Sequence, residues 1–148
     1  MANKTVLLIE DNPSDIELTK RALQRSRITN QLVVVQDGQE ALDYLLGMGP
    51  YAGRDISALP GVTLLDLHLP RMPGLEFLRA VRADPRTRRL PVVILTSSNE
   101  ERDIAAGYDL GVNSYIQKPV DFTQFAEAIR HLGLYWLILN EPPPPEIG

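Results

Sequence analysis

The sequence contains no cysteine, so disulfide bonds and thiolate metal sites are excluded, and the reducing interior of a cell is a compatible location. It contains only two histidines, which do not form the cluster that a histidine zinc site requires. Positive charge is also scarce, because 15 Lys and Arg stand against 19 Asp and Glu and give a formal net charge of -4. Nonspecific binding of nucleic acid needs the opposite balance, so no nucleic-acid partner is expected.

Long hydrophobic runs are missing as well. No apolar run approaches the roughly 20 residues that span a bilayer, so no membrane partner is expected. The first apolar run begins at about the fifth residue, which leaves no room for a cleavable signal. No Gly-x-Gly-x-x-Gly pattern follows this run, which disfavours dinucleotide binding. These absences favour a soluble protein of the cytoplasm.

The sequence does contain short apolar runs that alternate with amphipathic segments. The runs, which we expect to be strands, are Val6–Ile9, Leu32–Val35, Val62–Leu65, Val92–Leu95 and Ser114–Ile116. The helices expected between and after them cover residues 13–26, 37–46, 74–83, 99–110 and a last segment from 121. Near-continuous apolar strands are typical of a parallel sheet covered on both faces. The pattern therefore predicts an α/β fold, a doubly wound five-stranded parallel sheet of flavodoxin-like order 2-1-3-4-5 with five helices.

Two segments exceed this minimal plan. The connection 47–60 is longer than βαβ units usually need, so it is either a surface loop with its own role or simple spacing. The last helix is expected to be extended, because its stripe of core residues is joined by further apolar residues on every side: Leu134, Tyr135, Leu137, Ile138 and Leu139. With 148 residues, the chain fits one domain over 1–140 and a Pro-rich tail over 141–148.

Polar side chains follow four of the five strands. They are Glu10 and Asp11 after the first, Asp66 after the third, Thr96 after the fourth and Lys118 just past the fifth. Taken singly, each has an ordinary explanation as a helix cap or a solvated charge. However, the carboxyl ends of parallel strands meet at one edge of the sheet, where ligands bind. We therefore expect all five side chains to share one site.

Charge indicates what such a site holds. Two carboxylates 4 Å apart repel by about 4 kcal/mol at an effective dielectric near 20. A divalent cation together with the ammonium of Lys118 would balance Glu10, Asp11 and Asp66, and oxygen ligands suit Mg²⁺ or a similar hard ion such as Mn²⁺. In such a pocket Asp66 is the expected nucleophile for a phosphoryl group, and Thr96 the hydrogen-bond donor to the product.

From Thr5 to about Leu139 the chain resembles the receiver domains of two-component response regulators, on the stretches VLLIEDNPSD, LLDLHLPRMPG, VVILTSSNE and YIQKP. The resemblance implies that Glu10 and Asp11 form the acidic pair for Mg²⁺, with Asp66 and the backbone carbonyl of His68 as further ligands. It also implies that Asp66 accepts phosphate from the phosphohistidine of a histidine kinase.

The same resemblance assigns roles at the other strand ends. It implies that Thr96 and Lys118 contact the phosphoryl group and that Thr96 and Tyr115 form a switch pair. It further implies a cis peptide between Lys118 and Pro119.

The long connection and the LGLYWLILNEPPPP stretch resemble the stand-alone response regulators served by cyanobacterial-type phytochrome histidine kinases. In those relatives an extended last helix supports a homodimer, which here would cover the five extra apolar residues. Pro73 departs from the family, which more often has an acid at this position. His68 is an exposed loop residue or tunes access to Asp66, and His131 is a solvated or interface residue.

Two functions of other classes remain open. One is a scaffold that keeps the site but signals by dimerising, independently of phosphorylation. The other is a hydrolase with an aspartate nucleophile, although such phosphatases usually need an acid two residues after the nucleophile, where this chain has His68. The chain is otherwise not expected to be an enzyme, beyond catalysing its own phosphorylation and dephosphorylation.

Overall fold

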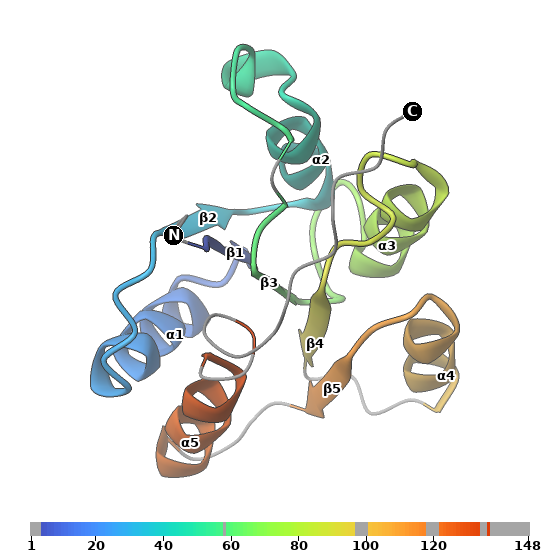
Figure 1. Ribbon diagram of the computed structural model, residues 1–148. Helices are drawn as coiled ribbons and strands as arrows, with labels where there is room; N and C mark the ends of the chain where they lie inside the picture. Colours follow the sequence, from blue (N-terminus) through green and yellow to red (C-terminus); the bar gives the residue numbers. More distant parts are fainter. Residues whose placement is uncertain (1–3, 58, 97–100, 118–121, 134–135, 137–148) are drawn as a thin grey trace.

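The computed structural model describes residues 4–57, 59–96, 101–117, 122–133 and 136. Its centre is a five-stranded parallel sheet of order β2-β1-β3-β4-β5, which confirms the predicted fold (Figure 1). The strands are β1 (Val6–Ile9), β2 (Leu32–Val35), β3 (Val62–Leu65), β4 (Val92–Thr96) and β5 (Ser114–Gln117). The helices are α1 (Pro13–Arg25), α2 (Gly38–Leu46), α3 (Gly74–Ala83), α4 (Glu101–Asp109) and α5 (Phe122–Gly133).

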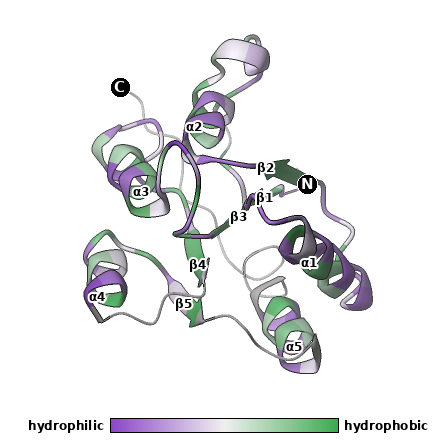
Figure 2. Ribbon diagram, turned by 180° about the vertical axis from the view of Figure 1, so that it is seen from behind, coloured by the Kyte–Doolittle hydropathy of each residue, from purple (hydrophilic) through white to green (hydrophobic). Residues whose placement is uncertain are grey.

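The helices cover both faces of the sheet. Helices α1 and α5 lie side by side on one face, and α2, α3 and α4 cover the other (Figure 1). Each face has its own apolar cluster, one centred on Phe77 and Ile94 and the other on Leu8 and Phe125. Strands β2 and β4 are hydrophobic along most of their length, β5 is mixed, and the helices show both characters (Figure 2). Two covered faces explain why the strands read as continuous apolar runs.

The register of the central strands aligns their carboxyl ends. Ile9 of β1 pairs with Leu65 of β3, and Leu65 pairs with Ile94 of β4. The residues that follow these strands must therefore emerge at the same edge of the sheet. This edge carries the predicted site.

The long connection after α2 is folded against that helix. The helix ends at Gly47, whose φ of 65° is the left-handed conformation that glycine adopts readily. A short 3₁₀ helix, η1 (Gly49–Tyr51), follows, and the Tyr51 hydroxyl donates to Glu40 Oε2 at 3.0 Å. The Arg54 guanidinium lies 4.0 Å from the centre of the Tyr44 ring, and its Nε donates to the Tyr44 carbonyl oxygen at 2.7 Å. The described part of the connection thus packs as an extension of α2.

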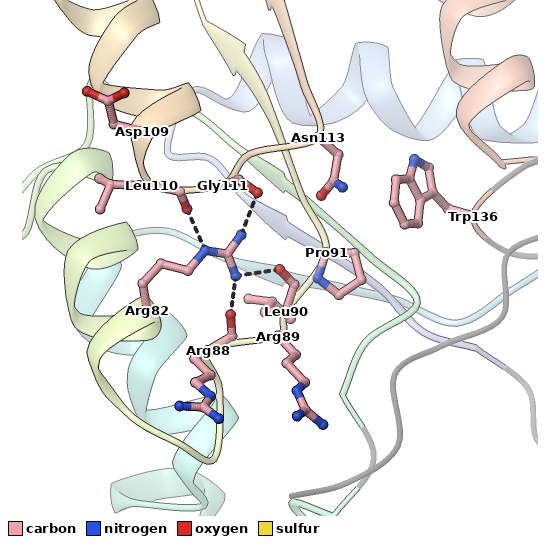
Figure 3. A pocket seen from close by; sticks show the side chains of 10 residues that line it. All are labelled: Arg82, Arg88, Arg89, Leu90, Pro91, Asp109, Leu110, Gly111, Asn113 and Trp136. Atoms are coloured by element: carbon pink, nitrogen blue, oxygen red, sulfur yellow. Dashed lines mark hydrogen bonds between the residues drawn. The ribbon is translucent and has the colours of Figure 1, made fainter.

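Arg82 lies at the opposite edge of the sheet, and burial lowers the pKa of its guanidinium. Its guanidinium donates to the carbonyl oxygens of Leu110, Gly111, Arg88 and Leu90 at 2.6 to 3.1 Å (Figure 3). These bonds join α3 to the loops before β4 and β5. The bonds border an open cleft of about 610 Å³, whose lining also includes Arg89, Pro91 and Trp136. This cleft, which Asp109 also lines, lies at the amino ends of the strands, opposite the predicted site.

The carboxyl-terminal region is described only in part. Helix α5 ends at Gly133, and Trp136 packs against the Leu8–Phe125 cluster, with its carbonyl oxygen accepting from Lys4 Nζ at 3.1 Å. The interface candidates Leu134, Tyr135, Leu137, Ile138 and Leu139 lie outside the described residues. His131 is exposed, 3.6 Å from the carboxylate of Glu127. Within the described part of the chain, no helix has both the length and the apolar character required to cross a membrane.

Candidate functional site

Three carboxylates meet at the carboxyl edge of the sheet, as the strand order predicts. Glu10, Asp11 and Asp66 each place a carboxylate oxygen within 4.8 Å of the others. Glu10 and Asp66 are buried, with exposed fractions of 2% and 7%, whereas Asp11 is exposed. The group therefore has a closed base and one open side, through which a solvated ligand can enter.

Asp66 is fixed by its own backbone and by two donors. Its amide donates to the Ile9 carbonyl oxygen at 3.1 Å, which continues the ladder between β3 and β1. Its Oδ1 accepts from the Thr96 hydroxyl at 2.8 Å and from the His68 amide at 3.1 Å. Gly74 closes the turn behind it, because a Cβ at this position would lie 2.5 Å from the Asp66 carbonyl oxygen. The carboxylate orientation is thus set by the fold.

The acidic pair has a different support. The amide of Glu10 donates to the Val35 carbonyl oxygen at 3.0 Å, and its Oε2 accepts from the amides of Asp11 and Asn12 at 3.2 and 3.4 Å. Asn12 caps α1, since its side chain accepts from the amides of Ser14 and Asp15. The ordinary explanation of Asp11 as the cap of this helix is therefore wrong. Its carboxylate stays beside Glu10 and Asp66.

The proposed switch residues lie on adjacent strands. Thr96 is the last residue of β4 and is fully buried, at 0% exposed. Tyr115 on β5 pairs with Ile94 and is half-buried against the cluster around Phe77. Gln117 pairs with Thr96, and Lys118 and Pro119, which come next in the sequence, lie outside the described residues. Five of the six described candidates thus lie at a single edge: Glu10, Asp11, Asp66, Thr96 and His68, the last through its backbone amide. Tyr115 lies further back along β5.

The donor set fits a hard divalent cation. All three side chains offer carboxylate oxygens, which Mg²⁺ and Mn²⁺ prefer over the ligands that select zinc or copper. Carboxylates held this close repel one another, so a bound cation would lower the electrostatic energy of the site. The Asn12 cap and the ladder bonds hold the acids together despite this repulsion.

Sequence reasoning missed one charged pair beside this site. Asp37, only 3% exposed, caps α2 by accepting from the Glu40 amide at 2.8 Å. Its other oxygen accepts from the guanidinium of Arg71, with Nε at 2.9 Å. Burial alone would raise the pKa of Asp37, but the Glu40 amide and Arg71 outweigh it, so this pKa lies below its usual value of 3.8. The Asp-Gly pair at the start of α2 signalled a cap, but no local pattern pointed to a partner 34 residues away.

Comparisons with known proteins agree with this geometry. The family model for the response regulator receiver domain matches residues 6–130. Response regulator Rcp1 of Synechocystis sp. is 35% identical over 90% of this chain and 89% of its own length. Its Mn²⁺-bound crystal structure has a TM-score of 0.83 over 95% of this chain and 99% of that one, at 34% identity.

Two further solved structures are similar over nearly the whole chain. The phosphorylated cyanobacterial phytochrome response regulator RcpA is 39% identical, with a TM-score of 0.86 over 96% of this chain and 99% of that one. The bacteriophytochrome response regulator RtBRR is 51% identical, with a TM-score of 0.78 over 97% of this chain and 86% of that one. Fold, strand-end chemistry and family match point the same way: the chain belongs to the response regulator receiver domains of two-component signalling.

Proposed function

We propose that this protein is a stand-alone response regulator that accepts a phosphoryl group from a histidine kinase on Asp66 in a reaction dependent on Mg²⁺ or Mn²⁺. The observation that carries the proposal is the position of Asp66, with Glu10 and Asp11 within 4.8 Å and the Thr96 hydroxyl at 2.8 Å. A Mn²⁺-bound structure of Rcp1 and a phosphorylated structure of RcpA support it by likeness.

The chemistry follows from the fixed carboxylate. An oxygen of Asp66 attacks the phosphorus in line, a P–O bond forms, and the P–N bond to the kinase histidine breaks with its electron pair leaving on nitrogen. Glu10, Asp11, Asp66 and the His68 carbonyl would hold the cation, which supplies positive charge to the transferring oxygens. Preset hydrogen bonds on Oδ1 keep the nucleophile oriented before the donor arrives.

The remaining residues respond to the product. Thr96 gives up its bond to Asp66 and donates to a phosphoryl oxygen, while Lys118 neutralises a further oxygen. The ring of Tyr115, which is half-buried on the neighbouring strand, then moves inward behind Thr96. The predicted cis peptide between Lys118 and Pro119 belongs to the same segment. This movement alters the surface that a partner reads.

We propose a phytochrome-type kinase as the donor, because RcpA is a cyanobacterial phytochrome response regulator and RtBRR is a bacteriophytochrome response regulator. A cytoplasmic location and a homodimer complete the proposal, the dimer being built on Leu134, Tyr135, Leu137, Ile138 and Leu139. The chain covers 89% of the length of Rcp1 and 99% of the RcpA chain, so the likeness extends over nearly the whole of these two regulators.

Incubation with phosphoramidate and Mg²⁺, followed by intact-protein mass spectrometry, tests the proposal. The wild type should gain one phosphoryl group that hydroxylamine removes, as expected for an acyl phosphate, and EDTA should prevent the gain. Asp66→Asn should remain unmodified, whereas the control Asp109→Asn, an exposed acid on α4, should behave as the wild type. An unmodified wild type, or equal labelling of Asp66→Asn, would contradict the proposal.

The two other functions make different forecasts, which a partner-binding assay and a phosphate-release assay distinguish. A phosphorylation-independent scaffold would bind its partner equally well as wild type and as Asp66→Asn. A hydrolase would release phosphate continuously from a small ester. His68, at the position where such enzymes carry their second acid, is exposed and offers no carboxylate, which disfavours the hydrolase.

A further inference from the structure

The loop after Asp66 contains a residue in an unusual backbone conformation. Arg71 has a φ of 60°, in the left-handed region that residues with a side chain rarely adopt. Glycine or asparagine would fit this position with less strain. Conformations of this kind persist only where the surroundings hold them, and they concentrate at functional sites.

The conformation of Arg71 is held by an ion pair with Asp37, which is buried. Both Nε and Nη2 of Arg71 donate to the same oxygen of Asp37, and Asp37 is only 3% exposed while the Arg71 side chain is 72% exposed. The second oxygen of Asp37 is engaged by the Glu40 amide at 2.8 Å. Arg71 therefore anchors its loop to the first turn of α2.

Close packing connects this ion pair to the site around Asp66. A Cβ at Gly38, the first residue of α2, would lie 2.7 Å from the Met72 carbonyl oxygen. At the far end of the same loop, Gly74 donates its amide to the Leu67 carbonyl oxygen at 3.1 Å and lies directly behind Asp66. Loop 67–73 is thus confined between α2 and the phosphoacceptor. It also carries His68, whose amide binds Asp66 Oδ1.

The connection after α2 supports the same anchor from outside. Glu40 donates its amide to Asp37, while its carboxylate accepts from the Gln36 amide at 2.9 Å and from the Tyr51 hydroxyl at 3.0 Å. Tyr51 belongs to η1, so the extra segment helps to fix the turn that receives Arg71. This contact gives the extra segment a structural role.

We propose that Arg71 and Asp37 are a positioning pair, which holds loop 67–73 in the conformation that presents Asp66 and His68 to a divalent cation. The inference rests on the proposed function and adds residues that touch neither the cation nor the phosphoryl group. Residues that support ligands from outside commonly change metal affinity by tenfold or more when they are lost.

The sign of the effect separates positioning from simple electrostatics. If Arg71 acted only through its charge, removing this cation near three carboxylates would tighten binding of a divalent ion. If it positions the loop, removing it must weaken binding. Glycine is the suitable replacement, because it tolerates the φ of 60° and so removes the guanidinium without adding backbone strain.

Calorimetric titration of Mn²⁺ into Arg71→Gly tests the proposal. We expect the dissociation constant to rise by about tenfold, the lower end of the range for such supporting residues. The Tm should fall, because Asp37 loses its cationic partner, so the titration is performed well below the Tm of the variant. Faster amide exchange over residues 67–74 should accompany the change. Arg86→Ala breaks the pair between the exposed Arg86 and the half-buried Asp84 at the opposite edge and should bind Mn²⁺ as the wild type does.

A double-mutant cycle completes the test. Asp37→Asn retains a side-chain oxygen to cap α2 but lacks the charge, so Arg71→Gly should have much less effect in this background. An unchanged or lower dissociation constant in Arg71→Gly would overturn the positioning role, as would additive effects in the cycle. Failure of the wild type to bind Mn²⁺ would instead overturn the proposed function.

Discussion

At the scale of single residues, the site is built from three carboxylates that repel one another. Glu10 and Asp66 are buried next to each other and next to Asp11, so three like charges share one edge of the sheet. Hydrogen bonds from backbone amides and from Thr96 stabilise the charged forms but leave the mutual repulsion. This repulsion must therefore lower the free energy of unfolding of the metal-free protein.

Asp66→Asn should raise the Tm of the metal-free protein. The amide oxygen can still accept from Thr96, while one of three repelling charges is lost. Even a quarter of the roughly 4 kcal/mol expected for a charge pair at 4 Å and a dielectric of 20 would raise the Tm by about 3 °C. Scanning calorimetry in EDTA measures this, with Asp109→Asn as the control for net charge.

In Mg²⁺, the wild type should have a higher Tm than Asp66→Asn. A ligand at a hundred times its dissociation constant stabilises the folded state by about 2.7 kcal/mol. Only the wild type has all of the proposed metal ligands. The wild type should therefore gain more from Mg²⁺ than Asp66→Asn. A Tm of Asp66→Asn at or below that of the control in EDTA would show that the three acids do not repel as their spacing implies.

At the scale of elements, Pro73 leaves α3 without the side-chain cap that α1 and α2 receive from Asn12 and Asp37. Its φ of -57° and ψ of 153° are extended, and the helix begins at Gly74. An acid at this position is the more usual family residue. It could accept from the Glu76 amide in the first turn.

Pro73→Asp should therefore stabilise the protein relative to Pro73→Ala by about 1 kcal/mol, the usual contribution of a helix cap. Alanine is the matched control, since both variants lose the restriction that proline places on the unfolded chain. Urea unfolding of the two variants measures the difference. Equal midpoints would mean that the backbone before α3 cannot adopt a capping geometry.

The elements themselves were predictable because their patterns are local. The five strands agree with the apolar runs to within one residue, and α2 ends at Gly47 as its sequence indicates. The grouping of Glu10, Asp11, Asp66 and Thr96 was also predictable, because topology alone brings strand ends together. The Arg71–Asp37 pair was not, since it depends on a loop conformation with φ above zero that no sequence pattern marks.

At the scale of the whole molecule, the two edges of the sheet differ in which charge predominates. The carboxyl edge holds the three acids, and the amino edge holds Arg82, Arg88 and Arg89, together with Asp109, around its cleft (Figure 3). The overall charge of -4 conceals this separation. Stability at low pH should therefore depend on which acids have a fixed cationic partner.

Asp37 is such an acid, and its lowered pKa sets the sign of its effect. A carboxyl whose pKa is lower in the folded state adds stability above its ordinary value of 3.8 and loses it as the pH falls through the lower folded value. Urea midpoints should thus fall more steeply below about pH 4 in the wild type than in Asp37→Asn. Asp43→Asn on the same helix is the control, and identical slopes for wild type and Asp37→Asn would contradict the linkage.

The proposed dimer belongs to the same scale. Truncation would be a poor test, because Trp136 packs against the core and its carbonyl oxygen binds Lys4.

Ile138→Arg retains Trp136 and places a charge in the apolar segment that follows it. We expect a monomer by sedimentation, because an unpaired charge in an apolar interface carries a large desolvation penalty. Gln24→Arg, on the exposed side of α1, should sediment as the wild type does. If Ile138→Arg keeps the dimer mass, the interface lies elsewhere; if the wild type dimerises only with Mg²⁺ and beryllofluoride, a phosphoryl mimic, then the Thr96–Tyr115 switch controls assembly.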